Sequence, residues 1–197
     1  MKIRSTAIVL ALMAVLWMAT PSTASAQMGV LVGLNSANVS LDPEPDDFKT
    51  GSRTGFVGGL SFNVPLQDRF SVELDALFAQ KGTKLSAPGE TQEVKLNYLD
   101  IPVMGRINMS GSGPARLHLL IGPSFNFKLS EKFDPEEGNE DDQFEKFETA
   151  LVIGGGVTVS RFRIDLRYGL GLSNIIKDEE DFTGKNRVFS VLVGFGS

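Results

Sequence analysis

The feature that most constrains the fold is a two-residue alternation of apolar and other side chains in segments of about ten residues. In residues 162–172 every second residue is apolar, and the residues between them are arginine, aspartate or glycine. The same alternation marks residues 70–78, 116–128 and 189–195, with less regular versions at 28–38, 54–64, 94–109 and 147–159. Because successive side chains of a strand point to opposite faces, the sequence predicts an all-β fold of eight strands.

The links between these segments alternate between short and long. The short links are residues 65–69, 110–114 and 160. They are rich in Gly, Pro and Ser, which is typical of tight turns. The long, polar links are residues 39–53, 82–93, 130–146 and 174–186. Strict alternation of this kind is typical of an antiparallel up-and-down barrel with short turns at one end and long loops at the other. It places both chain ends on the short-turn side.

The first residues have the three-part pattern of a secretory signal peptide. Lys2 and Arg4 precede an apolar run over residues 7–19, and Ala24-Ser25-Ala26 forms a small-residue cleavage site. The run is short for a membrane helix, which needs roughly 20 residues. We therefore expect a signal peptide over residues 1–26 and one barrel domain over 27–197.

Composition excludes some classes of function. Loss of Lys2 and Arg4 changes the formal charge from −5 to −7, and an acidic chain is a poor partner for nucleic acid. The sequence has no cysteine, so neither disulfides nor thiolate metal sites can form.

Alternation alone is also compatible with a soluble, lipocalin-like ligand-binding barrel, which carries its charges outside. Two aromatic belts favour a membrane barrel instead. On the apolar face, the phenylalanines at the turn end are Phe62, Phe70, Phe162 and Phe195, and those near the loop end are Phe56, Phe78, Phe127, Phe147 and Phe189. The charged faces also carry many glycines, as expected in the crowded interior of eight strands.

The face opposite the belts carries matched charges, which is the third argument for a membrane barrel. Its predicted members are Glu73, Asp75, Asp100 and Asp165 with Arg106, Arg116, Arg163 and Arg167, and the single histidine, His118, faces the same way. Since an unpaired buried charge costs several kcal/mol, such matching is expected of a filled lumen. The sequence therefore predicts an eight-stranded antiparallel transmembrane β-barrel with a lumen charge network.

Neither catalysis nor a cofactor is expected. His118 has no serine with a convincing base and orienting acid around it. The acidic segment from Asp134 to Asp142 departs from the EF-hand template, because Gly138 occupies the fifth position instead of the sixth. We interpret the segment as a solvated loop, with loose binding of divalent cations as the alternative.

Several short motifs resemble those of a known family. They are residues 29–35 (GVLVGLN), 70–82 (FSVELDALFAQKG), 98–103 (YLDIPV), 122–124 (GPS) and 167–174 (RYGLGLSN). The chain resembles the outer membrane protein β-barrel domain family, the porin-like or PorT-like barrels of Bacteroidetes-type bacteria. The resemblance implies an outer-membrane location, periplasmic termini, contact with lipid and lipopolysaccharide, and assembly by the barrel-insertion machinery. Unlike many such barrels, the chain continues past its last aromatic residue, Phe195, with Gly196-Ser197.

Four functions fit this architecture. The first is a structural or surface-interaction barrel with acidic external loops. The second is a narrow ion or small-solute channel, since wide aqueous pores need about 16 strands. The third is an enzyme that acts on lipid substrates, and the fourth is a component of the envelope or of a secretion machine.

Overall fold

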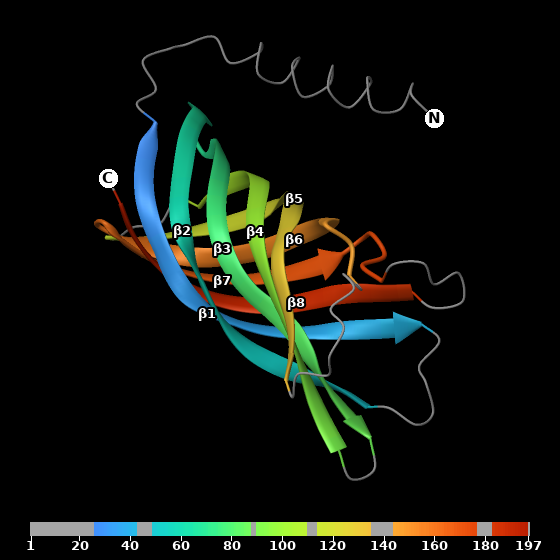
Figure 1. Ribbon diagram of the computed structural model, residues 1–197. Helices are drawn as coiled ribbons and strands as arrows, with labels where there is room; N and C mark the ends of the chain where they lie inside the picture. Colours follow the sequence, from blue (N-terminus) through green and yellow to red (C-terminus); the bar gives the residue numbers. More distant parts are fainter. Residues whose placement is uncertain are drawn as a thin grey trace, which may run out of the picture.

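The computed structural model describes residues 26–42, 49–87, 90–109, 114–134, 144–176 and 183–196. These form eight strands: β1 (Gln27–Asp42), β2 (Lys49–Gln67), β3 (Phe70–Ala87), β4 (Glu90–Asn108), β5 (Ala115–Asp134), β6 (Phe147–Val159), β7 (Phe162–Gly171) and β8 (Thr183–Gly196). Each strand pairs antiparallel with the next, and β8 pairs with β1 to close a barrel (Figure 1). The predicted fold is confirmed.

The turn end of the barrel matches the sequence closely. Asp68 and Arg69 join β2 to β3, and Ser160 and Arg161 join β6 to β7. Asp68 and Ser160 take positive φ angles of 32° and 57°, as residues in tight turns often do. The start of β1 lies at this same end, because Gly29 pairs with Gly196 near the end of β8. In the part of the chain described, no helix is long and apolar enough to span a membrane.

The strands extend further at the loop end than the sequence predicted. β3 continues to Ala87 and β4 begins at Glu90, so the expected loop over 82–93 is almost entirely a paired hairpin. The expected loops over 39–53, 130–146 and 174–186 also lose residues to β1, β2, β5 and β8. β5 has 20 residues, whereas roughly 9–11 residues cross a bilayer. The loop-end parts of the longer strands therefore form an extension of the wall beyond the apolar band.

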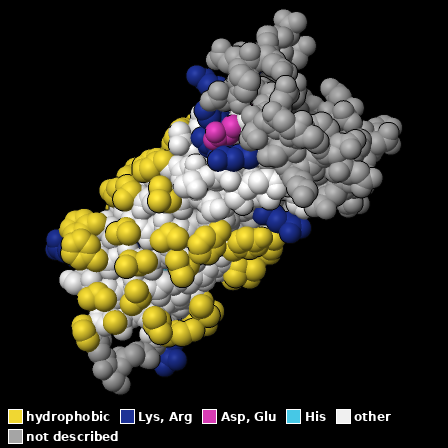
Figure 2. All heavy atoms as spheres, turned by 90° about the horizontal axis from the view of Figure 1, so that it is seen from below, with side chains coloured by type: hydrophobic (Ala, Val, Ile, Leu, Met, Phe, Trp, Pro, Cys, Tyr) yellow, Lys and Arg dark blue, Asp and Glu magenta, His cyan; other side chains and the backbone are white. Residues whose placement is uncertain are grey.

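The two faces of the wall are as predicted in the band between the aromatic belts. On β7, Ile164 and Leu166 point outward with half of their surface exposed, and Asp165 is buried inside. Figure 2 shows hydrophobic side chains covering this part of the wall, with charged side chains beyond it. The pattern reverses in the extension. On β1, Ser36 is exposed on the outside, whereas Val39 is buried inside.

Eight of the nine predicted belt phenylalanines are exposed, and Phe62 is half-buried. Two pairs join neighbouring strands. The ring centroids of Phe162 and Phe195 are 5.2 Å apart at the turn end, and those of Phe127 and Phe147 are 5.2 Å apart at the loop end. Each belt thus contains an aromatic pair in the tilted arrangement that favours ring contact.

Candidate functional site

The lumen of the barrel is the candidate site, and strand β3 shows how it is layered. Its inward side chains are all buried and follow one another from the turn end in the order Ser71, Glu73, Asp75, Leu77, Ala79 and Lys81. The strand thus passes from a polar cavity through an ion cluster and an apolar layer to a second ion cluster. Each layer is completed by inward residues of the other strands.

The ion cluster nearer the turns is called the turn-side ion cluster. Its members are Glu73, Asp75, Arg106, His118, Arg163, Asp165 and Arg167. Glu73 is fully buried and binds three guanidinium groups. Its Oε2 accepts hydrogen bonds from Arg106 at 2.9 Å and from Arg163 at 2.8 Å. Its Oε1 accepts from Arg167 at 2.8 Å. One carboxylate of β3 therefore joins β4 and β7 across the lumen.

Arg167 binds three carboxylates at once. Besides Glu73, it donates to Asp75 Oδ2 at 2.6 Å and to Asp165 Oδ2 at 2.8 Å. Arg163 Nε also lies 3.3 Å from Asp165 Oδ2. The other oxygen of Asp165 lies 2.9 Å from His118 Nε2, and both side chains are buried.

The turn-side ion cluster is electrically balanced without a charge on His118. Arg106, Arg163 and Arg167 supply three positive charges, and the three carboxylates supply three negative ones. The imidazole of His118 contacts Asp165 through Nε2 and completes the set. Breaking one member of such a buried set leaves an uncompensated charge, which is strongly destabilising.

Above this cluster, toward the loop end, one part of the lumen wall becomes apolar. The apolar layer is a packed group of buried side chains consisting of Leu31, Val57, Leu77, Ala79 and Leu192. These residues come from β1, β2, β3 and β8. A small cavity here is lined by Leu77 and Leu192 and also by the charged side chains of Lys81, Asp100 and Arg167.

The loop-side ion cluster, consisting of Lys81, Asp100 and Glu148, follows. Lys81 Nζ lies 2.9 Å from Asp100 Oδ1 and 3.9 Å from Glu148 Oε2. Asn186 donates to Glu148 at 2.9 Å. The ammonium group of Lys81 also lies 4.5 Å from the centroid of the Tyr98 ring, in a cation–π contact.

Tyr98 belongs to a further apolar group, the cap, in which Phe144 packs against the buried Val94, Leu96 and Tyr98. The cap lies inside the extension of the wall, where the inward residues of β4 are apolar. It adjoins the loop-side ion cluster through the contact between Tyr98 and Lys81.

The structure separates the nine predicted network residues into three places. Seven form the turn-side ion cluster, and Asp100 belongs instead to the loop-side ion cluster. Arg116 is exposed at the turn end of β5 and lines a cavity there. The sequence analysis missed Lys81 and Glu148 as lumen residues. Both could have been found from the alternation. Lys81 lies on the inward face if the pattern is continued past Phe78, and Glu148 follows the outward-facing Phe147.

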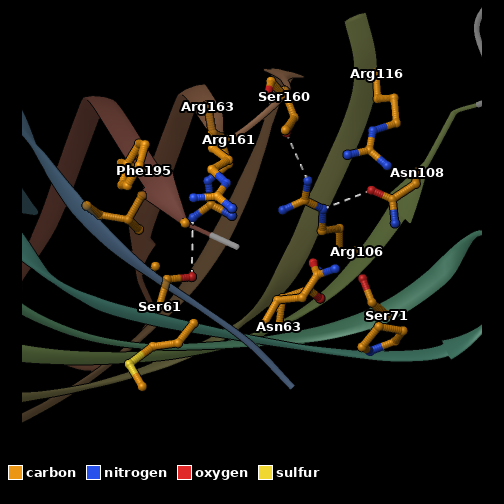
Figure 3. A pocket seen from close by; sticks show the side chains of 18 of the residues that line it. Ser61, Asn63, Ser71, Arg106, Asn108, Arg116, Ser160, Arg161, Arg163 and Phe195 are labelled. Carbon is orange, nitrogen blue, oxygen red and sulfur yellow. Dashed lines mark hydrogen bonds between the residues drawn. The ribbon is translucent and has the colours of Figure 1, made fainter. Parts of the chain in front are cut away.

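The cavity at the turn end measures about 530 Å³. It is lined from several strands, and Figure 3 shows arginine, serine and asparagine side chains around it. Arg106 donates to Asn108 Oδ1 at 3.0 Å and to Thr158 Oγ1 at 3.3 Å, which holds its guanidinium between the cavity and the turn-side ion cluster. A smaller cavity of about 60 Å³ lies at the level of the apolar layer and the loop-side ion cluster.

The possible cation site lies outside the described residues for the most part, because residues 135–143 are not among them. Elsewhere in the described chain, no group of three His, Asp or Glu side chains is placed to hold a metal ion. Binding of divalent cations by the acidic loop therefore stays a prediction.

A closed eight-stranded wall with an apolar outside, aromatic belts and a charged lumen defines the class of small outer-membrane barrels. The sequence matches the family described as "Outer membrane protein beta-barrel domain" over residues 19–177, and the chain belongs to this family. Membership indicates the bacterial outer membrane as its location. No curated protein sequence matches the chain.

Solved structures show the same fold at low sequence identity. Neisserial surface protein A is 16% identical, with a TM-score of 0.53, over 85% of this chain and 96% of that one. The outer membrane protein OprG from Pseudomonas aeruginosa is 12% identical, with a TM-score of 0.54, over 88% of this chain and 97% of that one. Both likenesses concern the fold alone.

Proposed function

We propose that this protein is a closed, non-conducting barrel that forms a stable structural element of the outer membrane and presents its loop-end extension to partners outside the cell. The observation that carries the proposal is the filled lumen. A solute entering from the turn end would meet the turn-side ion cluster, the apolar layer, the loop-side ion cluster and the cap in succession.

The energetics of this order oppose conduction. A permeating ion would have to displace guanidinium–carboxylate contacts of 2.6–2.9 Å and then pass the packed apolar layer. The small cavity near the loop-side ion cluster, about 60 Å³ in volume, has room for only a few water molecules.

The extension supports the second half of the proposal. Its outer face is polar, with exposed Ser52, Thr54 and Lys84 on β2 and β3. Its inside is packed by the cap. Backbone pairing continues to Lys49–Ser86 between β2 and β3 and to Ala87–Glu90 between β3 and β4. A paired and packed wall is a rigid support for surface contacts.

The proposal assigns no catalytic role to His118. Its side chain is 1% exposed and its Nε2 is held by Asp165 within the turn-side ion cluster. A general base must reach the proton that it removes, and a buried ring hydrogen-bonded to Asp165 is poorly placed to do so.

The test is planar-bilayer conductance of the refolded barrel, with folding confirmed by heat-modifiable migration on gels. A wide trimeric porin in the same bilayer serves as the positive control. We expect no reproducible conductance steps from this protein. Regular steps that change in size in the Arg167→Gln variant would contradict the proposal and favour the narrow channel.

A further inference from the structure

The cavity at the turn end is strongly basic. The charged residues that line it are five arginines and one carboxylate, namely Arg69, Arg106, Arg116, Arg161, Arg163 and Asp68. They come from β4, β5, β7 and the two turns, so the cavity collects positive charge from separate parts of the chain. Figure 3 shows the side chains of Arg106, Arg116, Arg161 and Arg163 gathered around the space.

Within the described part of the chain, two of these arginines are neutralised by a carboxylate. Arg106 and Arg163 both bind Glu73 behind the cavity wall. Arg69, Arg116 and Arg161 are exposed and form no ion pair with any described residue. Like charges gathered around one cavity repel one another and attract anions from solution.

A second observation points to a ligand. Ser71 also lines the cavity, is 3% exposed, and its Oγ has no hydrogen-bond partner. Leaving a buried hydroxyl unpaired costs free energy. An anion oxygen in the cavity would accept a hydrogen bond from this hydroxyl as well as from the arginines.

We propose that this cavity binds a small multivalent oxyanion of the phosphate class. The guanidinium group presents paired N–H donors that match the oxygens of a phosphate. Three arginines without an ion pair to any described residue suit a ligand with at least two negative charges. The volume of about 530 Å³ falls within the range of roughly 300–1,000 Å³ typical of small-molecule sites. This inference holds whether or not the barrel conducts.

The experiment is calorimetric titration of inorganic pyrophosphate into the refolded, detergent-solubilised full barrel at low salt. The test variant is Arg116→Gln/Arg161→Gln, which removes two exposed charges without touching the turn-side ion cluster. The matched control is Arg187→Gln, which removes one exposed charge from the loop-end half of β8. Heat-modifiable migration confirms that all three proteins are folded.

We expect saturable binding with one site per barrel that weakens at least about tenfold in the double variant, because each charged hydrogen bond lost is worth about 1.5 kcal/mol or more. Binding by the Arg187→Gln variant should equal that of the unchanged protein. Absence of saturable binding, or equal affinity in the double variant and the unchanged protein, would overturn the proposal.

A second titrant separates the two sources of such an anion. Bis(glycerophospho)glycerol, the deacylated form of cardiolipin, is a lipid headgroup with two negative charges, and pyrophosphate represents a soluble phosphate compound. Tighter binding of bis(glycerophospho)glycerol assigns the cavity to a lipid headgroup, and tighter binding of pyrophosphate assigns it to a soluble ligand. Both results must depend on Arg116 and Arg161 to support the site.

Discussion

Arg167 joins three carboxylates inside the barrel and is itself 5% exposed. Removing it would leave Glu73, Asp75 and Asp165 with fewer positive neighbours in a space that excludes water. Its contribution to stability therefore comes from the charges that it neutralises and not from its own burial. Arg161, in the turn that precedes β7, is exposed and has no such partner among the described residues.

We predict that Arg167→Met lowers the free energy of unfolding by about 3–5 kcal/mol, the cost of breaking a buried ion pair from one side. Urea-induced unfolding in lipid vesicles, followed by loss of heat-modifiable migration, measures the change. Arg161→Gln is the control and should change stability by less than about 0.5 kcal/mol. Equal effects of the two substitutions would show that the turn-side ion cluster does not stabilise the fold.

The sequence was sufficient to predict most of the cluster, and the reason is local. Alternation on β7 places Arg163, Asp165 and Arg167 on one face, and a narrow barrel forces such a face to be neutral. Which carboxylate meets which arginine depends on register across strands far apart in the chain, and no local pattern encodes that. Arg116 was placed in the network because the alternation includes it, but it lies one residue from the start of β5, at the rim.

At the scale of the strands, the sequence predicted their number, order, turns and faces, but not their length. The hydrophobic pattern inverts above the lipid band: on β1 the outward side chains change from Leu34 to Ser36, and the inward ones become Ala37 and Val39. A strand was identified in the sequence by apolar side chains on its outward face. A strand segment with a polar outward face therefore resembles a loop. Only the pairing of β3 with β4 up to Ala87–Glu90 shows that these residues are strand.

The distance between neighbouring strands predicts how two lumen-facing glycines tolerate substitution by alanine. A Cβ added at Gly156 on β6 would lie 2.2 Å from the carbonyl oxygen of Ile164 and 2.5 Å from Asp165 Oδ1. A Cβ at Gly169 on β7 would meet no atom closer than 3.7 Å.

Gly156→Ala should therefore destabilise the barrel by about 1–3 kcal/mol, as overpacking does. Gly169→Ala should be neutral or slightly stabilising, because glycine weakens a strand interior. The same urea measurement compares the two variants. A larger loss from Gly169→Ala than from Gly156→Ala would mean that the strands are not this close at Gly156.

At the scale of the whole molecule, the two ends of the barrel differ in a way that favours one orientation in the membrane. The turn end has short links and the basic cavity, and the loop end has the polar extension. Short turns face the periplasm in outer-membrane barrels. We therefore propose that the turn end, with both chain ends, is periplasmic and that the extension is outside the cell.

Because the sequence has no cysteine, single cysteines can test this orientation. In intact cells, Lys84→Cys should react with a polymer-linked maleimide too large for porins, and Arg69→Cys should not. Arg69→Cys should react once the outer membrane is permeabilised. The opposite pattern in intact cells would reverse the orientation.

The central claim is that the apolar outer wall contacts lipid, and tryptophan fluorescence tests it most directly. The sole tryptophan, Trp17, lies within the predicted signal peptide. A barrel refolded from residues 27–197 therefore contains no tryptophan, and an introduced one is the only source of tryptophan emission. Val193, on the outer face of β8, is 48% exposed and pairs with Ile164 and Val32. In Val193→Trp, brominated acyl chains should strongly quench the emission and aqueous acrylamide should not. Emission that acrylamide quenches and brominated lipid leaves unchanged would contradict the claim.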